Sequence, residues 1–238
     1  MFVGVAAVAL LVPTPATAEV TDIKLTYHVL RDEVGDVAID GSAYANDGVL
    51  RGGVSRGVGV YKFHRLSLDH RYDRITAPDD PSLSPESAAF TFRVRLKVSP
   101  DAEWSHSEMA VLRHGDSDTP GGDYKMELLK NPNNGVVSAE CVMHDVDGAG
   151  AGYIRGRGPL RSIADGHWHT IACSRVDEDT VSLTIDGQPA YHEVRGDLGD
   201  IVGQARLMIG CQLAADRIHK REQFVGKLDN ITIKTVQP

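Results

Sequence analysis

Residues 90–98 read FTFRVRLKV, an unbroken alternation of apolar with polar or charged side chains. Because successive side chains of a strand point to opposite faces of a sheet, this pattern predicts an antiparallel strand with one face on a core and the other in water. Residues 181–185, VSLTI, repeat the alternation and lead into Asp186 and Gly187. Both residues tolerate the positive φ that tight hairpin turns require, so a hairpin is predicted at this point.

Further strands are predicted along the chain, with turn signals between them. The strong candidates are residues 168–176 and 224–234, and the weaker ones are 60–63, 74–77, 124–129, 136–144 and 205–209. The 24 glycines and 11 prolines are scattered rather than clustered, which favours many turns and few long helices. Short strands in this number predict an all-β fold in which two antiparallel sheets pack face to face as a sandwich.

The charge balance limits the partners of the chain. It has 25 Lys and Arg residues against 33 Asp and Glu residues, a formal net charge of −8. Nucleic acids and anionic membrane surfaces are bound through an excess of positive charge, so neither is expected as the principal partner. With 42% hydrophobic residues and no break in composition, residues 19–238 are predicted to form one domain.

The first residues indicate secretion. Residues 2–12, FVGVAAVALLV, form a short apolar run that is followed by two prolines and the small-residue triplet ATA at 16–18. This order is typical of a secretory signal peptide over residues 1–18, with cleavage after Ala18 and an extracellular mature protein. The alternative is a buried hydrophobic segment. The run is too short to span a membrane, so no membrane insertion is expected.

Several short motifs follow one another along the chain. They are DGSAYANDG at residues 40–48, YDRITAPDD at 72–80, FTF at 90–92, DGHWH at 165–169, VSLTIDG at 181–187 and FVGKLD at 224–229. The ordered set resembles the LamG-like (laminin G-like) domains of the concanavalin A-like lectin/glucanase superfamily. This resemblance implies a jelly-roll sandwich that is usually secreted and often recognises carbohydrate or protein. Because one fold hosts many functions, the function has to be argued from the site.

The chain has three cysteines, an odd number for a secreted protein. The resemblance implies a disulfide between Cys141 and Cys173 across neighbouring strands, and pairing of Cys173 with Cys211 is the alternative. A Cys141–Cys173 bridge would stabilise the fold by about 3–4 kcal/mol in the chain-entropy description. Cys211 is then expected to be a buried thiol. No Cys-x-x-Cys spacing indicates a zinc or redox site.

The sequence does not indicate an enzyme. Glucanases of the resembled superfamily place their catalytic carboxylates on one strand in an E-x-D-x-x-E pattern, which this chain lacks. Residues 53–57 spell GVSRG, a G-x-S-x-G sequence, but loop and strand signals surround it instead of a strand and a helix. No catalytic residue is therefore predicted, and a polysaccharide-degrading enzyme is the least favoured alternative.

The opening loop at residues 40–48 carries side-chain oxygens of the kind that bind calcium. The resemblance implies that Asp40, Asn46 and Asp229 share one structural calcium between this loop and the last strand. Tyr44 departs from the family, which tends to have Gly or Asn in this part of the loop, and it removes flexibility. The alternative is an Asx-type turn without an ion.

Carbohydrate binding is the function that the sequence favours. Sugars are bound by aromatic rings that stack on them and by polar groups that meet their hydroxyls. Aromatic residues make up only 6% of the chain, and Trp104 stands out because it lies in a polar segment, PDAEWSH. Trp104 is therefore the candidate ligand-binding residue, with capping of the sandwich end as the equal alternative. The expected partner is a polysaccharide or glycoconjugate, and the alternative is an interaction module that binds an extracellular protein.

Overall fold

The computed structural model describes residues 20–29, 34–64, 72–104, 106–116, 120–146, 151–155, 162–178, 180–194, 198–212 and 222–237. Within these ranges the chain forms strands and one short 3-10 helix, η1 (Pro81–Leu83). None of the described helices is long and apolar enough to cross a membrane. The predicted signal peptide, residues 1–18, lies outside the described residues.

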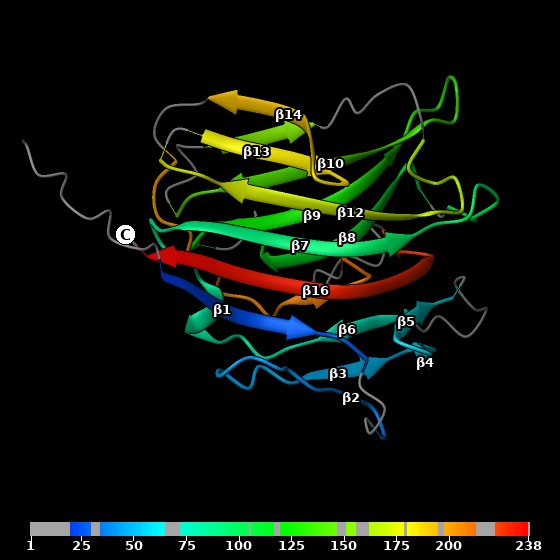
Figure 1. The fold of residues 1–238 in the computed structure, drawn as a ribbon, viewed down its shortest axis with the longest axis horizontal. Coiled ribbons are helices and arrows are strands. Elements are labelled where there is room, and N and C mark those ends of the chain that lie inside the picture. Colours follow the sequence, from blue (N-terminus) through cyan, green and yellow to red (C-terminus); the bar gives the residue numbers. More distant parts are fainter. Residues whose placement is uncertain are drawn as a thin grey trace, which may run out of the picture.

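The strands form two sheets of eight strands each, and every strand pairing is antiparallel. The first sheet, in front in Figure 1, has the order β14 (Gln188–Val194), β13 (Thr180–Ile185), β12 (Trp168–Arg175), β7 (Ala89–Lys97), β16 (Gly226–Gln237), β5 (Val60–Phe63), β4 (Ser55–Gly57). β1 (Val20–Tyr27) also pairs with β16. The second sheet has the order β11 (Ala151–Arg155), β10 (Val137–His144), β9 (Asp123–Lys130), β8 (Glu108–Gly115), β15 (Met208–Ile209), β6 (Arg74–Thr76), β3 (Gly48–Arg51), β2 (Val37–Ala38).

The hydrophobic core lies between the two sheets. The alternation in β7 has the predicted effect, because Phe90, Phe92 and the next two alternate residues are buried while the residues between them are not. Tyr124 of β9 reaches across from the second sheet, and its ring centroid lies 5.2 Å from that of Phe90 and 5.0 Å from that of Phe92. The predicted two-sheet, all-β sandwich is therefore confirmed.

The predicted hairpin joins β13 to β14. Asp186 and Gly187 have φ values of 54° and 74°, so both positions of the turn use the left-handed conformation that their sequence favours. Of the strand predicted at 205–209, only Met208 and Ile209 form a strand, β15. β8 was not predicted, because a β-bulge between Ala110 and Leu112 breaks its alternation and nearly all of its residues are buried.

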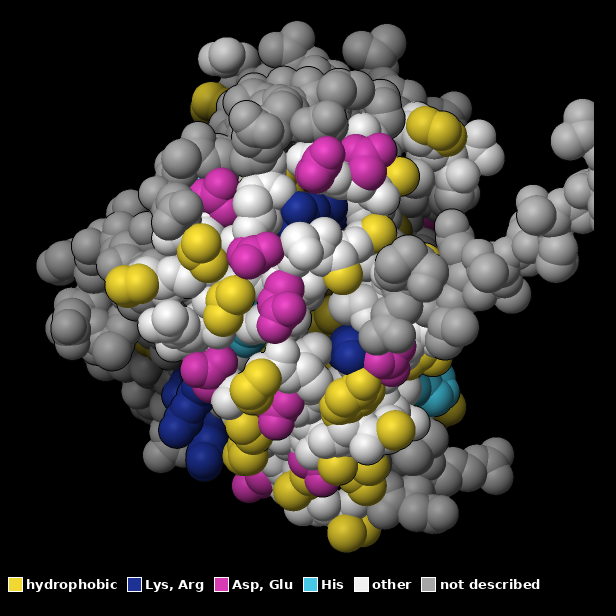
Figure 2. Space-filling model, turned by 90° about the vertical axis from the view of Figure 1, so that its left-hand side faces the viewer, with side chains coloured by type: hydrophobic (Ala, Val, Ile, Leu, Met, Phe, Trp, Pro, Cys, Tyr) yellow, Lys and Arg dark blue, Asp and Glu magenta, His cyan; other side chains and the backbone are white. Residues whose placement is uncertain are grey.

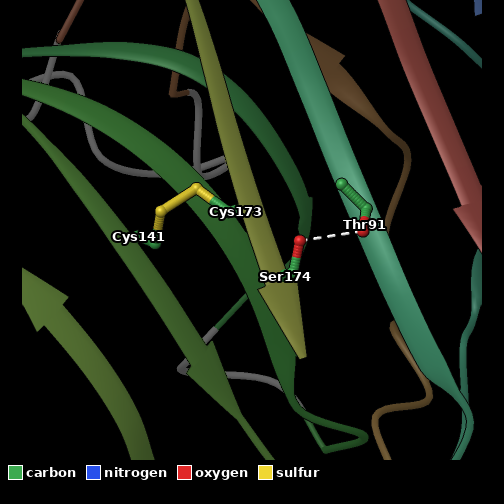
Figure 3. The surroundings of a disulfide bond; sticks show 4 residues. All are labelled: Thr91, Cys141, Cys173 and Ser174. Atoms are coloured by element: carbon green, nitrogen blue, oxygen red, sulfur yellow. Dashed lines mark hydrogen bonds between the residues drawn. A yellow bond between two sulfur atoms is a disulfide. The ribbon is translucent and has the colours of Figure 1, made fainter. Parts of the chain in front are cut away.

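A disulfide joins Cys141 of β10 to Cys173 of β12 (Figure 3), with a Cα–Cα distance of 5.8 Å. The two strands belong to different sheets, so the bridge crosses the core instead of linking neighbouring strands as the resemblance implied. Both cysteines occupy inward positions of their strands and are fully buried. Ser174, the next residue of β12, points away from the core and shares a hydrogen bond of 2.8 Å with Thr91 of β7. Cys211 is buried and forms no disulfide.

Candidate functional site

The carboxylate of Asp40 anchors the opening loop. Its Oδ1 accepts hydrogen bonds from the backbone amides of Thr26 (2.8 Å) and Ser42 (2.9 Å). Its Oδ2 accepts from the hydroxyl of Ser42 (2.6 Å) and from the backbone amide of Asn46 (2.9 Å). The side chain of Asn46 in turn donates to the carbonyl of Lys24 (3.0 Å). The carboxylate thus holds an Asx-type turn, and N–H and O–H donors already engage both of its oxygens.

Asp229 lies on the other side of β1 from Asp40, since Tyr27 of β1 bridges to Asp40 and pairs with Ile231 of β16. Its Oδ1 is 2.7 Å from Nδ1 of His28, and its Oδ2 accepts a hydrogen bond of 3.1 Å from Arg95.

His28 and Arg95 therefore lie beside the carboxylate of Asp229. No group of three His, Cys, Asp or Glu side chains in the described part of the chain could hold a metal ion. A calcium shared by Asp40, Asn46 and Asp229 stays a prediction.

Trp104 is half-buried. It packs against the hydrophobic core, and the ammonium of Lys130 lies 5.7 Å from its ring centroid. This packing agrees with the alternative that Trp104 caps the end of the sandwich. Its role in ligand binding stays a prediction.

Ligand sites are typically clefts or cavities of about 300–1,000 Å³. A cavity of ≈ 790 Å³ lies at the end of the first sheet, where β5 and β7 end and β16 begins. We call it the β5–β16–β7 cavity. Its lining combines apolar surface with lysine, histidine and serine side chains: Lys62, Phe63, His64, Lys97, Ser99, Ala102, Gly166, Val225, Gly226 and Lys227. Ala102 belongs to the same loop as Trp104.

Gly226 lets two strands meet at the floor of this cavity. A Cβ atom at this position would lie 2.5 Å from the carbonyl oxygen of Lys97 and 3.0 Å from the ring of Phe224. Only glycine therefore permits the approach of β16 to β7 here without a shift of the backbone.

Trp168 stands beside the cavity on the outer face of the first sheet. It is directly opposite Lys97 in the pairing of β12 with β7. The guanidinium of Arg95 lies 4.5 Å from the centroid of its ring, a cation–π arrangement that orients both side chains. Arg95 also contacts Asp229. Trp168 begins β12, in agreement with the strand predicted from residue 168, and the residues that contact its ring come from β7.

A second, smaller cavity of ≈ 240 Å³ lies beside the β13–β14 hairpin and includes His169. Nδ1 of His169 is 2.8 Å from Asp186, and Nε2 is 3.1 Å from Asp165. Burial alone would lower the pKa of His169, but hydrogen bonds to these two carboxylates raise it. The contacts tie the turn before β12 to the β13–β14 hairpin.

The second sheet carries a group of buried carboxyl side chains that the sequence did not indicate. Glu127 of β9 lies directly opposite Glu140 of β10, and both are almost fully buried. Gln212, in the amide orientation that satisfies its partners, donates hydrogen bonds to Glu222 (2.8 Å) and Glu127 (3.3 Å). Burial, followed by the charges of Glu127 and Glu108, raises the pKa of Glu222 to about 7. Lys125 pairs with Glu127 at 2.9 Å, and Gln212 bridges Glu127 and Glu222, so these buried carboxyls are held by contacts within the fold.

No protein-family model matches the sequence, and no curated protein does. Solved structures match it by fold. The binding domain of Paraclostridial Mosquitocidal Protein 1 aligns with a TM-score of 0.61 and 14% identity over 89% of this chain and 48% of that chain. The receptor binding domain of botulinum neurotoxin C/D mosaic serotype aligns with a TM-score of 0.62 and 13% identity over 89% and 47%. The botulinum neurotoxin serotype D ligand binding domain in complex with N-acetylneuraminic acid aligns with a TM-score of 0.60 and 13% identity over 89% and 48%.

Identities this low show similarity of fold alone. The chain also spans about half the length of the structures that it matches, at 47% and 48%. The LamG-like resemblance stays a prediction about finer family membership. What the comparisons show is that this chain is a two-sheet antiparallel β-sandwich similar to part of the binding domains of clostridial toxins.

Proposed function

We propose that the chain is a secreted, non-catalytic recognition domain that binds a carbohydrate or glycoconjugate in the β5–β16–β7 cavity. The observation that carries the proposal is the composition of this cavity. Ala102 and Val225, which are partly exposed, offer apolar surface to the C–H groups of a sugar, while lysine, histidine and serine side chains can bond its hydroxyls.

Two further observations support the proposal. The matched solved structures are binding domains, and one of them is described as a complex with N-acetylneuraminic acid. A buried disulfide is typical of proteins that fold in an oxidising, extracellular environment.

A glycan array tests the proposal, with purified protein applied in millimolar calcium and again in chelator. The variant Ser99→Trp places a large ring in the cavity from an exposed position and should abolish binding of any glycan found on the array. Asn133→Trp, in the exposed turn between β9 and β10, is the matched control and should bind like the parent protein. Equal binding by Ser99→Trp would place the ligand elsewhere.

The same preparation separates the alternatives. Trp104→Ala tests the predicted ligand contact. A loss of glycan affinity supports that contact only if the melting temperature of the variant is unchanged, since the ring also packs on the core. Release of reducing ends from β-glucan, chitin or alginate would show an enzyme. If no glycan binds and a defined extracellular protein does, with a dissociation constant that Ser99→Trp weakens, the chain is a protein-interaction module.

A further inference from the structure

Three lysines lie in one line across the first sheet, beside the β5–β16–β7 cavity. In the strand pairing, Lys227 of β16 is directly opposite Lys97 of β7 on one side and Lys62 of β5 on the other. Their neighbours Leu96 and Leu228 are buried in the core, so the lysines occupy the outer face. We call Lys62, Lys97 and Lys227 the lysine row.

The lysine row has an energetic cost within the fold. Adjacent strands are about 4.8 Å apart, so the three Cα atoms span about 10 Å. Like charges directly opposite one another in a sheet destabilise it. Among the described residues, no ion pair or side-chain hydrogen bond joins any of the three ammonium groups to an acidic side chain. A counter-charge from outside the chain would remove the repulsion.

The overall composition does not explain this concentration of positive charge, because the chain has a net charge of −8. Acidic side chains gather at the opposite end of the sandwich, where β12 ends. Asp145, Asp177, Glu178 and Asp200 act there on the buried guanidinium of Arg175. Figure 2 looks onto this end and shows Asp and Glu side chains spread over it. This cluster of acidic side chains thus lies away from the lysine row, at the other end of β12.

Aromatic and guanidinium groups extend the lysine row on its β12 side. Trp168 continues the line directly after Lys97, and Arg95 lies over its ring. Arg93, two residues before Arg95 on β7, is exposed on the same face. A sugar ring next to Trp168 would thus have cationic side chains on either side of it.

We propose that the ligand of the β5–β16–β7 cavity is an acidic oligosaccharide whose sulfate or carboxylate groups bind the lysine row. This inference rests on the proposed function and specifies its ligand class. A short oligosaccharide fits better than an extended polyanion, because the row has three lysines and the net negative charge of the chain repels a long polyanion beyond it. Both anionic groups accept hydrogen bonds from ammonium, so sulfate and carboxylate share the required chemistry.

Calorimetric titration with three hexasaccharides tests the inference: a sulfated heparin fragment, an oligogalacturonate and neutral maltohexaose. We expect at least tenfold tighter binding of one acidic probe than of the neutral one. Lys227→Gln should weaken acidic binding about five- to tenfold, and the triple variant with Lys62→Gln and Lys97→Gln should abolish it. The affinity of the parent protein should also fall as salt rises, and less steeply in Lys227→Gln.

Lys234→Gln is the matched control, since Lys234 lies on the same strand, seven residues or about 20 Å further along β16. It should bind the acidic probes like the parent protein. Lys227→Gln should keep or slightly raise the melting temperature, because it relieves repulsion, which separates a binding role from a structural one.

The outcomes distinguish the two proposals. Neutral and acidic probes that bind equally, with no effect of Lys227→Gln, would overturn the lysine-row inference and leave carbohydrate binding in place. Absence of binding by all probes and by the glycan array would overturn both. Tighter binding to duplex DNA or to phosphatidylserine vesicles than to either acidic probe would show a general polyanion or membrane surface and would also overturn the inference.

Discussion

Glu222→Gln is predicted to change how folding stability depends on pH. Burial and the charges of Glu127 and Glu108 raise the pKa of Glu222 from 4.5 to about 7 in the folded protein. In the unfolded chain the carboxyl returns to its ordinary pKa, so between pH 4.5 and 7 the folded state binds more protons than the unfolded state. The free energy of unfolding must therefore fall as the pH rises through this window.

The magnitude follows from the size of the pKa change. One pKa unit corresponds to about 1.4 kcal/mol, so the pKa change sets an upper limit of about 3 kcal/mol on the cost of ionising this carboxyl above pH 7. Glu222 titrates together with neighbouring carboxyls and keeps some contact with solvent, and both effects reduce that cost. Gln has nearly the same shape and stays neutral at every pH. We expect Glu222→Gln to match the parent protein within about 0.5 kcal/mol at pH 4 and to exceed its stability by about 1–2 kcal/mol at pH 8.

Urea titrations at pH values from 4 to 8, analysed by linear extrapolation, measure this difference. Asp36→Asn is the matched control, because it makes the same change from carboxylate to amide at an exposed position. It should follow the parent protein across the pH range. A gain from Glu222→Gln that is the same at pH 4 and pH 8, or no gain at pH 8, would refute the reasoning that burial holds this carboxyl protonated.

Three further predictions concern stability. Replacing both Cys141 and Cys173 by Ala should lower the free energy of unfolding by about 3–4 kcal/mol in urea titrations, because the bridge closes a loop with a sequence separation of 32 residues. A thiol titration of denatured, non-reduced protein checks the pairing and should find one thiol per chain, that of Cys211. Asp40→Ala should lower the free energy of unfolding by about 2–4 kcal/mol, since the carboxylate of Asp40 accepts hydrogen bonds that hold the opening loop. Parental stability of this variant would contradict the reasoning, and a melting temperature that falls in chelator would support the predicted calcium. Gly226→Ala should lower the free energy of unfolding by about 1–3 kcal/mol in the same titrations, because the Cβ atom of the alanine would meet the carbonyl oxygen of Lys97. A variant as stable as the parent protein would show that β16 and β7 can move apart without cost.

The strands that sequence reasoning predicted best are those whose two faces have different surroundings. β7 and β13 each have one face on the core and one face less buried, so their side chains alternate and the alternation is visible in the sequence. β8 is buried over nearly its whole length and contains a bulge, and both features remove the alternation. Regular alternation therefore identified some strands and not others.

Only part of the candidate site can be predicted from the sequence. The polar segment that contains Trp104 marks that residue as a candidate ligand contact, and Ala102 of the same segment lines the cavity. Lys62 and Lys227, by contrast, are far apart in the chain and lie in different short segments, and nothing in either segment marks them as partners. Pairing of β16 with β5 and β7 brings them together.

By itself the sequence determined local properties of this protein: that alternating segments such as β7 and β13 are strands, where Asp186 and Gly187 turn the chain, and that its net charge is negative. These properties depend on side-chain period and backbone preference over a few residues. Strand order and register were decided only in the tertiary structure, because they depend on contacts between distant segments. Register places the three lysines of the lysine row opposite one another. The assignment of β10 and β12 to different sheets places the disulfide across the core, and packing of distant segments buries the carboxyl of Glu222.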